Sequence, residues 1–392
     1  MSLDENDCKM AEGVFNGRID VVKAALAAGA NVNGTPEQPL APIATATIAN
    51  HAGMVEFLLE RGADPDKPVT IDLTAATPGE RALHIAARGG YVEIARLLLE
   101  AGADPTLAEE RGFLPLHYVA LKGHLDMVDM LYSRAPATLN VCADMGQTPL
   151  LSACCGDQEK MVSKLLSMGA MQRIPAHETD TSPLMMAAGR GLVGVMRVLI
   201  NEGGIWAVGG SDGLSQALYM AVHFKRTTIL RLLLAAVGDN EDRPSWANTS
   251  NAEGTRLLHN GAGLCYPAAV SILLEAGADE AARDTSGRTP LDVIGAELGR
   301  EDKVHRMYRG KEVAVRRMLQ RGPAYRARSW AWPSDAEEAD TDGGGGRGTA
   351  AAAAAAVLSS PPAMKTAPVI GVRIFRPKEK SSGKFFVTLI GR

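Results

Sequence analysis

The chain has few aromatic residues, few cysteines and no long apolar run. Phe, Trp and Tyr together make up 5% of its 392 residues, and its five cysteines show neither a paired framework nor a C-x-x-C spacing. This cysteine usage argues against a disulfide scaffold and predicts a reducing compartment. No apolar run approaches the roughly 18 residues that a membrane helix needs, and the acidic start, Met1 to Glu5, is unlike a secretory or transit segment. We therefore expect a cytoplasmic or nuclear protein without a transmembrane segment.

One pattern recurs along most of the chain. Each copy has a turn of small residues ending in Gly, an apolar segment of the type T-P-L-H-x-A-A, and a second apolar segment of the type V-V-x-x-L-L that closes on Gly-Ala-Asp. The Leu of the first segment, or its substitute, marks the register at Met10, Ile43, Leu83, Leu116, Leu150, Leu184, Leu218, Leu258 and Leu291. The intervals are 33 or 34 residues, with two of 40. Such a period, with two short helices and a turn per unit, predicts a helical solenoid.

The pattern resembles the ankyrin-repeat family. Its plainest copies are residues 82–87 with 94–104 and residues 114–120 with 127–131, and the resemblance covers roughly residues 5 to 325. It implies an all-α fold, an ankyrin-type solenoid of about nine helix-turn-helix repeats with degenerate first and last units as caps. One helix pair cannot bury its own apolar face, so neighbouring units must stack. We expect a single elongated repeat domain over residues 5–330.

The residues at the ends of the repeat segments predict where its helices begin and end. Thr148-Pro149, Ser182-Pro183 and Thr289-Pro290 read as starts of inner helices, because Thr or Ser caps free N–H groups and Pro at the first helical position loses no hydrogen bond. Outer helices should end on a left-handed residue. The glycines expected in that conformation are Gly29, Gly62, Gly102, Gly169 and Gly277.

The units are unequal. Extra residues follow Asp64-Pro65 and Val237, and such insertions are either binding loops on one face or merely tolerated surface loops. The ninth unit inserts residues 299–310 before its outer-helix pattern resumes at 313–319. This stretch is basic and amphipathic, which suits a membrane-surface or calmodulin-target helix. A C-terminal capping helix with a charged outer face is the interpretation that we favour.

Charge and composition change along the chain. Residues 1–299 carry 23 basic and 36 acidic residues, whereas residues 300–392 carry 18 and 9. The basic part could dock on the acidic part or bind an acidic partner. Residues 331–367 are rich in acidic residues, Gly and Ala, which predicts a disordered linker. In the basic tail, residues 368–392, the segments 369–376 and 385–390 predict a possible β-hairpin.

A search for catalytic or metal-binding groups finds none that we would assign. His84, His117 and His259 share one register position, and we expect their rings to tie one unit's turn to the next rather than to bind a metal. Cys154 and Cys155 should lie in an inner helix without a neighbour that would activate a thiol. We therefore expect no enzyme activity, no cofactor and no metal.

The resemblance also implies where a partner would bind. In this family the turns and the outward side of the inner helices line a concave groove. By register, the expected protein-binding residues are Glu80, Arg88, Arg111, Phe113, Lys122, Gln147, Cys155, Thr181, Arg190, Ser215, His223 and Phe224. The Arg and Lys residues among them suggest an acidic or phosphorylated ligand segment; a solvated face of mixed charge is the alternative.

We predict a non-catalytic protein–protein interaction module, a scaffold or adaptor that binds partner proteins in this groove. The alternative is recruitment to nucleic acid or acidic lipid membranes through the basic residues 300–330 and 365–392. Salt separates the two, because binding by phosphate neutralisation falls steeply with added salt.

Overall fold

The computed structural model describes residues 5–35, 38, 40–70, 77–172, 182–203, 210–237, 246–251, 254–296, 302–321, 370–375 and 386–391. Most of these residues divide between two compact units. Unit 1 contains the repeats up to Ala170, and unit 2 contains the described residues from Ser182 to Arg321. The predicted all-α architecture is confirmed in both units.

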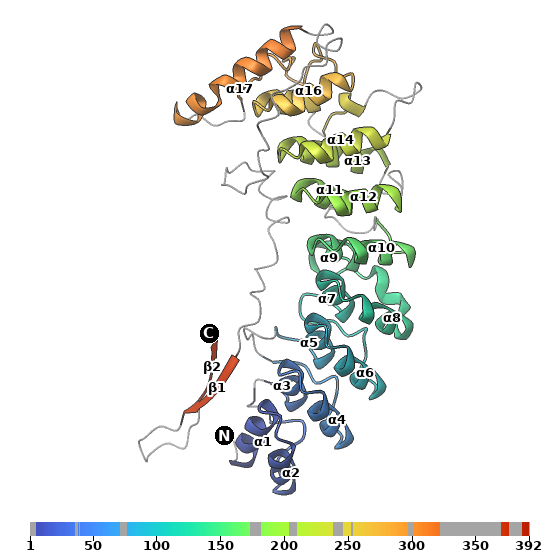
Figure 1. Cartoon of the computed structure of the whole chain (residues 1–392), viewed down its shortest axis with the longest axis vertical. Helices are drawn as coiled ribbons and strands as arrows, with labels where there is room; N and C mark the ends of the chain where they lie inside the picture. Colours follow the sequence, from blue (N-terminus) through green and yellow to red (C-terminus); the bar gives the residue numbers. More distant parts are fainter. Residues whose placement is uncertain are drawn as a thin grey trace. The chain divides into compact units, whose positions relative to one another are not determined.

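Unit 1 is a stack of helix pairs, each with an inner helix followed by an outer one (Figure 1). The pairs are α1 (Glu5–Phe15) with α2 (Ile19–Ala27), α3 (Pro42–Ile48) with α4 (Ala52–Glu60), α5 (Ala82–Gly89) with α6 (Val92–Glu100), α7 (Pro115–Lys122) with α8 (Leu125–Arg134), and α9 (Pro149–Cys155) with α10 (Glu159–Ser167). Two 3-10 turns, η1 (Pro136–Asn140) and η2 (Asp144–Gly146), precede α9. Inner helices pack on inner helices from α1 to α9, and α4, α6, α8 and α10 pack in sequence. The apolar face of each pair is thus buried against its neighbours.

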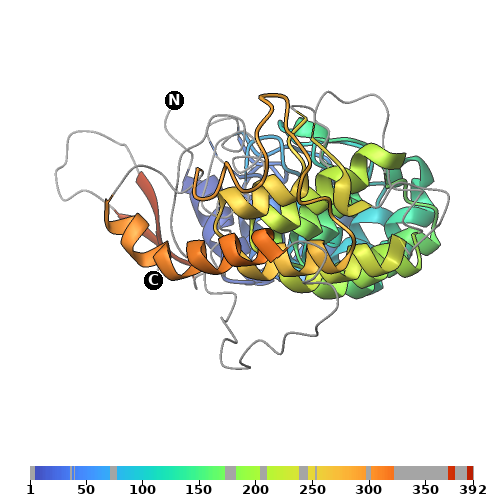
Figure 2. The same ribbon diagram turned by 90° about the horizontal axis from the view of Figure 1, so that it is seen from above.

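Unit 2 repeats this arrangement and ends in one long helix. Its pairs are α11 (Pro183–Arg190) with α12 (Val193–Asn201), α13 (Gly210–His223) with α14 (Thr227–Val237), and α15 (Leu257–Gly263) with α16 (Pro267–Glu275). A 3-10 turn, η3 (Trp246–Asn248), comes before α15. The last helix, α17 (Asp302–Arg321), packs along α16 (Figure 2).

The helix ends follow the predicted chemistry. The hydroxyls of Thr148 and Ser182 accept the N–H groups of Leu151 and Met185, at 3.1 and 3.2 Å, so both predicted caps are confirmed. All five predicted glycines have positive φ, from 83° at Gly62 to 101° at Gly29.

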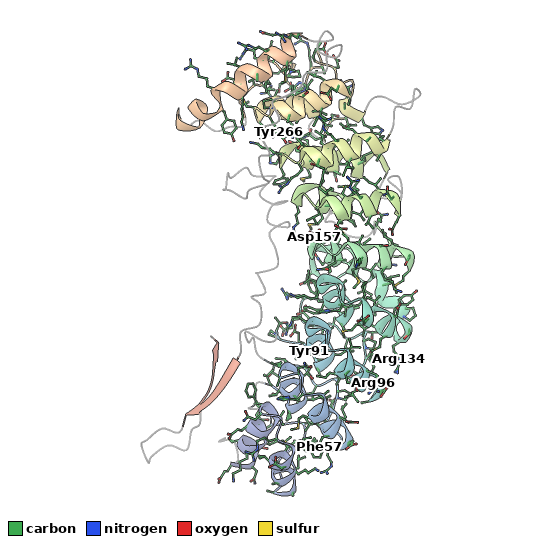
Figure 3. The ribbon with its side chains drawn as sticks, in the orientation of Figure 1. Phe57, Tyr91, Arg96, Arg134, Asp157 and Tyr266 are labelled. Atoms are coloured by element: carbon green, nitrogen blue, oxygen red, sulfur yellow. The ribbon has the colours of Figure 1, made fainter. Side chains whose placement is uncertain are left out.

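A second left-handed position lies between the inner and outer helix of each pair. Glycine fills it in several units, but Asn50, Asp157, Lys225 and Cys265 fill it in others, with φ between 47° and 58°. Figure 3 marks Asp157 at the end of α9. A side chain in this conformation crowds the following carbonyl group. The four repeats with these residues therefore carry local strain that the repeats with glycine at this position avoid.

The shared histidines tie each turn to the next, as predicted. His84 accepts the N–H of Arg81 through Nδ1, at 3.3 Å, so its Nε2 carries the proton and donates to the carbonyl of Phe113 at 3.1 Å. His117 bonds in the same way to the N–H of Leu114 and the carbonyl of Gln147. The Nε2 of His259 lies 2.9 Å from the carbonyl oxygen of Arg288. These rings therefore connect the turn of one repeat to the turn of the next, both in unit 1 and in unit 2.

The first insertion contributes to the core. Val69 exchanges backbone hydrogen bonds with the far side of its loop, through Gly79 and Glu80 at 2.8 and 2.7 Å, and its buried side chain packs with Ala44 and Ile85. Val69 therefore belongs to the core, which neither the binding-loop nor the tolerated-loop interpretation predicted. Residues 71–76 of the first insertion, and residues 238–245 and 252–253 of the second, lie outside the described residues.

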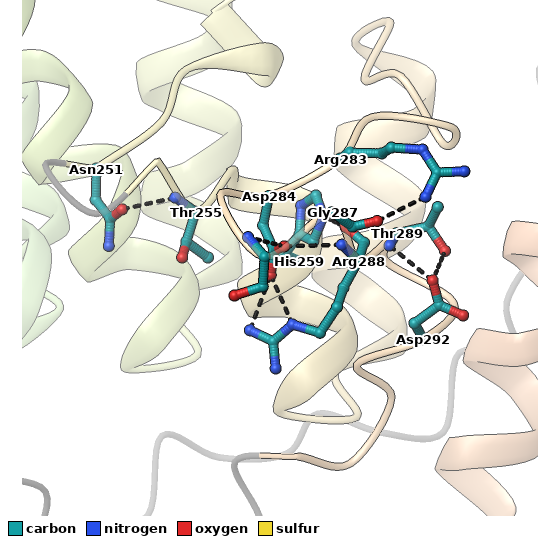
Figure 4. A network of polar contacts seen from close by, with 10 residues as sticks. Asn251, Thr255, His259, Arg283, Asp284, Gly287, Arg288, Thr289 and Asp292 are labelled. Atoms are coloured by element: carbon teal, nitrogen blue, oxygen red, sulfur yellow. Dashed lines mark hydrogen bonds and ion pairs between the residues drawn. The ribbon is translucent and has the colours of Figure 1, made fainter.

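The structure of the ninth repeat differs from the prediction. No α-helix begins at Thr289-Pro290, and residues 290–296 form successive turns instead (Figure 4). The hydroxyl of Thr289 donates to the carboxylate of Asp292 at 2.7 Å, so it does not cap a helix. Gly295 then donates its N–H to Ala262 of the preceding repeat rather than to a carbonyl of its own segment. The unit therefore consists of turns followed by the single helix α17.

The predicted β-hairpin is confirmed. Strands β1 (Ile370–Phe375) and β2 (Phe386–Gly391) pair antiparallel, with Ile370 opposite Gly391 and Phe375 opposite Phe386. The predicted linker lies outside the described residues. Within the described part of the chain, no helix combines the length and the apolar character that a membrane span requires.

Candidate functional site

In unit 1 the turns and the inner helices form one continuous strip of side chains. The residue three places before the register Leu reaches the residue five places after it. Thus Glu80 Oε1 lies 2.7 Å from the guanidinium of Arg88, and Gln147 Nε2 lies 3.5 Å from Cys155 Sγ. This register-determined contact joins the turn to the helix in the third and fifth repeats. We call Arg88, Arg111, Phe113 and Gln147, together with the side chains that contact them, Glu80, Glu109, Tyr118 and Cys155, the unit 1 strip.

Two arginines of the strip lie over aromatic rings. The guanidinium of Arg111 is 5.3 Å from the ring centre of Phe113, and that of Arg88 is 5.9 Å from the ring centre of Tyr118. The two rings are themselves 5.9 Å apart. Cation–π contacts of this kind hold a guanidinium flat against the surface. The third and fourth repeats thus share one patch of arginine and aromatic side chains.

Each arginine has a buried glutamate beside it. The side chain of Glu80 is 0% exposed, whereas that of Arg88 is 19% exposed. Glu109 is 1% exposed, and its Oε2 lies 3.7 Å from Nε of Arg111, which is 41% exposed. The arginines therefore face solvent while the carboxylates lie beneath them.

The position of Glu80 corrects a prediction, because we expected it on the binding surface. Its carboxylate accepts the N–H of Thr77 at 3.1 Å and pairs with Arg88, so it holds the arginine in place. Burial raises the pKa of Glu80, although Arg88 opposes this shift. The two buried glutamates also offset the charge of two arginines, which weakens the charge argument for an acidic ligand.

Burial keeps the neighbouring histidines uncharged. It lowers the pKa of His84 to about 3 and that of His117 to about 4, even though hydrogen bonds to backbone carbonyls act in the opposite direction. Both rings are neutral near pH 7, as their acceptor role at Nδ1 requires. Burial also raises the pKa of Tyr118, and the carboxylates of Glu80 and Glu109 add to that effect. His84 and His117 beside the strip, and Tyr118 within it, are thus buried polar groups that stay uncharged at neutral pH.

The remaining predicted residues are distributed between the two units. Lys122 is exposed at the end of α7 in unit 1. Arg190, Ser215, His223 and Phe224 are half-buried in unit 2, and Thr181 lies outside the described residues. Glu80, Arg88, Arg111, Phe113, Lys122, Gln147 and Cys155 thus lie in unit 1, and the other described residues of the predicted set lie in unit 2.

In unit 2 the last turn of α13 carries an aromatic cluster. The His223 ring stacks on Tyr219 at 6.1 Å and meets Phe224 edge-on at 5.1 Å. Burial lowers the pKa of His223, so it belongs to the apolar contacts rather than to the charged ones. Two of the predicted residues, His223 and Phe224, thus form a second patch.

Sequence reasoning missed Tyr118 and Glu109. Tyr118 follows the register histidine, a position usually filled here by a smaller side chain, so its size was the available signal. Glu109 occupies the first position of the turn, where its carboxylate accepts the N–H of Phe113. Asn251 and Asp284 do the same for Thr255 and Arg288 in unit 2 (Figure 4). The repeated turn position predicts the role of Glu109, but its contact with Arg111 follows only from the fold.

No cluster of three or more His, Cys, Asp or Glu side chains suited to a metal ion occurs among the described residues. Cys154 is buried in α9, and Cys155 is half-buried beside Gln147. The predicted placement of this cysteine pair in an inner helix is confirmed.

Comparison with known proteins gives the same family along about four tenths to half of the chain. A family model described as ankyrin repeats (3 copies) matches residues 10–109 and 105–174. The chain is 26% identical over 237 residues to the ankyrin repeat and KH domain-containing protein mask-1 of Caenorhabditis elegans. It is 30% identical over 214 residues to the ankyrin repeat protein nuc-2 of Neurospora crassa. Each match takes in 52% of this chain, but only 9% of mask-1 and 19% of nuc-2, so the chain spans a small part of these relatives.

A third relative is matched over nearly its whole length. The ankyrin repeat protein YahD of Escherichia coli is 30% identical over 195 residues, which are 48% of this chain and 92% of YahD. The repeat register, the histidine ties and the stacked helix pairs agree with these matches. This chain belongs to the ankyrin-repeat family.

Proposed function

We propose that the protein is a non-catalytic scaffold or adaptor that binds a partner protein along the unit 1 strip. Ankyrin repeats indicate a protein–protein interaction module. The observation that carries the proposal is the patch in which Arg111 lies over Phe113 and Arg88 over Tyr118. Arginine and aromatic side chains are the residue types that dominate binding energy in protein interfaces. Buried groups already fix the arginine and aromatic side chains of this patch. Binding a partner therefore costs little additional side-chain entropy.

The proposed ligand is a protein segment that offers both an anionic and an apolar group. The guanidinium groups of Arg88 and Arg111 are of the kind that binds a carboxylate or a phosphate, and exposed Lys122 adds a charge. The ring of Phe113 gives an apolar contact beside them. Because Glu80 and Glu109 offset two positive charges, we assign the larger share of affinity to directed hydrogen bonds and ring contacts. An acidic or phosphorylated segment remains the proposed ligand class.

The proposal includes the compartment and the division of the chain. None of the five cysteines, all of which lie among the described residues, forms a disulfide, which supports a reducing compartment, cytoplasmic or nuclear. We also propose a repeat domain over residues 5–330, a linker over 331–367 and a basic tail over 368–392. Recruitment to nucleic acid or acidic membranes through residues 300–330 and 365–392 is the alternative.

The test is affinity capture with the full chain at low and high salt, read by mass spectrometry. The variant Arg111→Ala with Phe113→Ala removes both partners of one cation–π contact of the strip. The matched control, Arg96→Ala with Val92→Ala, removes an arginine and an apolar residue from the outer helix α6 (Figure 3). We expect a protein that the wild type and the control retain at high salt and that the strip variant loses. Retention of nucleic acid or lipid alone, lost at high salt, would replace this proposal with the alternative.

A further inference from the structure

Helix α17 presents a stripe of arginines on its outward face. Arg309, Val313, Arg316, Arg317, Gln320 and Arg321 are all exposed. Their spacing of 4, 7, 8, 11 and 12 residues from the first places them on one side of a helix. We call this set the α17 stripe. It lies in unit 2 and shares no residue with the unit 1 strip.

The opposite face of α17 is fully used. Val315, Met318 and Leu319 are buried, and α17 packs on α16. At its first described side chains, Tyr308 accepts a hydrogen bond from Lys225 at 3.1 Å, and the same ammonium lies 4.9 Å from the Tyr308 ring centre. This packing, with a buried apolar face and a charged outer face, is what the capping-helix interpretation predicted for α17. The side chains of Val315, Met318 and Leu319 are therefore not available for a membrane or for a protein that wraps an amphipathic helix.

The charge of the stripe is almost unopposed. From Tyr308 to Arg321 the helix has five basic residues and one acidic residue, Glu312. Glu312 lies 3.7 Å from Arg316, which is a long ion pair, and Lys311 lies near the ring of Tyr308. Among the described residues no ion pair involves Arg309, Arg317 or Arg321. Like charges at neighbouring helix positions weaken a helix slightly, so folding stability gives no reason for this arrangement.

We infer that the α17 stripe is a docking site for a short acidic segment of a partner protein. Four guanidinium groups provide planar pairs of donors that match carboxylates. From Arg309 to Arg321 the helix rises about 18 Å, which an extended peptide spans in about five or six residues. The charge and the length therefore fit a run of a few Asp and Glu residues.

Two other anionic surfaces fit less well. A membrane surface would need apolar side chains to insert, and Val313 is the one large apolar side chain exposed on the described part of α17. A nucleic acid continues beyond the stripe, and the same unit exposes the carboxylates of Glu275, Asp279 and Asp292. These would repel the phosphates of a longer polymer, whereas a short peptide avoids them.

The experiment measures binding of a fluorescein-labelled hexaglutamate peptide to the full chain by fluorescence anisotropy at low salt. The test variant is Arg316→Gln with Arg317→Gln. The control variant, Arg197→Gln with Arg231→Gln, removes the same charge from exposed positions of α12 and α14 in the same unit. We expect at least about tenfold weaker binding for the test variant, since two charge-assisted contacts are lost. For the control we expect a change of less than about twofold, because neither arginine belongs to the stripe and no direct contact with the peptide is lost.

Several results would overturn the inference. One is an equal loss of affinity in the test and control variants, which would mean that net charge alone attracts the peptide. Another is tighter binding of a DNA duplex or of phosphatidylserine vesicles than of the peptide. A third is binding that appears only when the acidic residues of segment 335–342 are changed to amides, since this chain itself would then compete for the stripe. Matching thermal unfolding of the variants shows that any loss is not caused by unfolding.

Discussion

The arginines of the unit 1 strip and those of the α17 stripe differ in what lies behind them. Arg88 and Arg111 are each accompanied by a buried glutamate, whereas Arg317 and Arg321 have no such carboxylate among the described residues. A buried partner fixes a guanidinium and removes most of its net charge. An arginine without a partner keeps its charge and its freedom. The comparison shows one residue type in two settings, which under our two proposals serve shape recognition in unit 1 and charge recognition on α17.

The largest expected effect comes from removing a buried partner. Glu80→Ala removes the buried carboxylate that pairs with Arg88 and leaves the N–H of Thr77 without its acceptor. We expect unit 1 to lose about 2 to 4 kcal/mol of unfolding free energy, measured by urea denaturation. The corresponding change on α17, Glu312→Ala, should cost less than about 0.5 kcal/mol, because its ion pair is long and solvated. Equal losses of unfolding free energy in Glu80→Ala and Glu312→Ala would contradict this difference between the unit 1 strip and the α17 stripe.

The second effect is a pH dependence confined to the histidine-bearing repeats. The pKa of His84 is about 3 and that of His117 about 4 in the folded chain, below the value of 6.5 expected in the unfolded chain. Between pH 6.5 and about 4, the unfolded state therefore binds protons that the folded state does not. The unfolding free energy should fall with decreasing pH by up to about 1.4 kcal/mol per pH unit for each histidine.

Denaturation at a series of pH values measures this slope, and His117→Gln should reduce it. The raised pKa of Glu80 acts in the opposite direction, because a carboxyl that is easier to protonate when folded stabilises the fold as the pH falls. A flat profile above pH 4.5 would contradict the buried, neutral histidines. Arginine does not titrate in this range, so the α17 stripe should keep its charge, and its affinity for an acidic peptide should fall only as the peptide's own glutamates are protonated, at about pH 4.3.

A third prediction concerns the left-handed residues between helices. Asp157 is exposed with φ of 55°, so Asp157→Gly should raise the unfolding free energy of unit 1 by about 1 kcal/mol through relief of strain. Lys225→Gly in unit 2 should gain less, because it also removes the contact with Tyr308. Thermal unfolding of both variants measures the difference. A destabilised Asp157→Gly variant would show that the aspartate makes a contribution that outweighs its strain.

The smallest expected effect is on the stability of unit 2. Arg316→Gln with Arg317→Gln should change its unfolding free energy by less than about 0.5 kcal/mol, since both side chains are exposed. Thermal unfolding at low and high salt checks this expectation. A loss of several kcal/mol would mean that these arginines hold α17 in place rather than face a partner.

The sequence predicted features that depend on one repeat and its neighbour. The period, the caps at Thr148 and Ser182, the left-handed glycines and the histidine ties all follow from residues at fixed register positions. The burial of Glu80 did not follow, because it depends on Arg88 and on the turn around Thr77. Such contacts are set by side-chain packing and not by spacing.

The ninth unit shows a second limit. Its Thr289-Pro290-Leu291 segment has the local signals of an inner helix, but the Thr289 hydroxyl donates to Asp292 and the Gly295 N–H bonds to Ala262. A local signal is overridden when a neighbouring repeat offers the backbone another partner. The sequence showed that α17 would be basic and amphipathic. Which of its faces is buried follows only from the packing against α16.

The most direct test of the central claim is site-specific photo-crosslinking in the full chain. Benzoylphenylalanine replaces Lys122, beside the unit 1 strip, or Val92, on the outer helix α6, and each protein is irradiated in a cell lysate. A protein partner bound along the strip predicts a discrete crosslinked species from position 122 that is absent from position 92. That species should disappear when Arg111→Ala and Phe113→Ala are added. Crosslinking from position 92 alone, or a position 122 product that survives the added changes, would contradict the proposal that the unit 1 strip binds the partner.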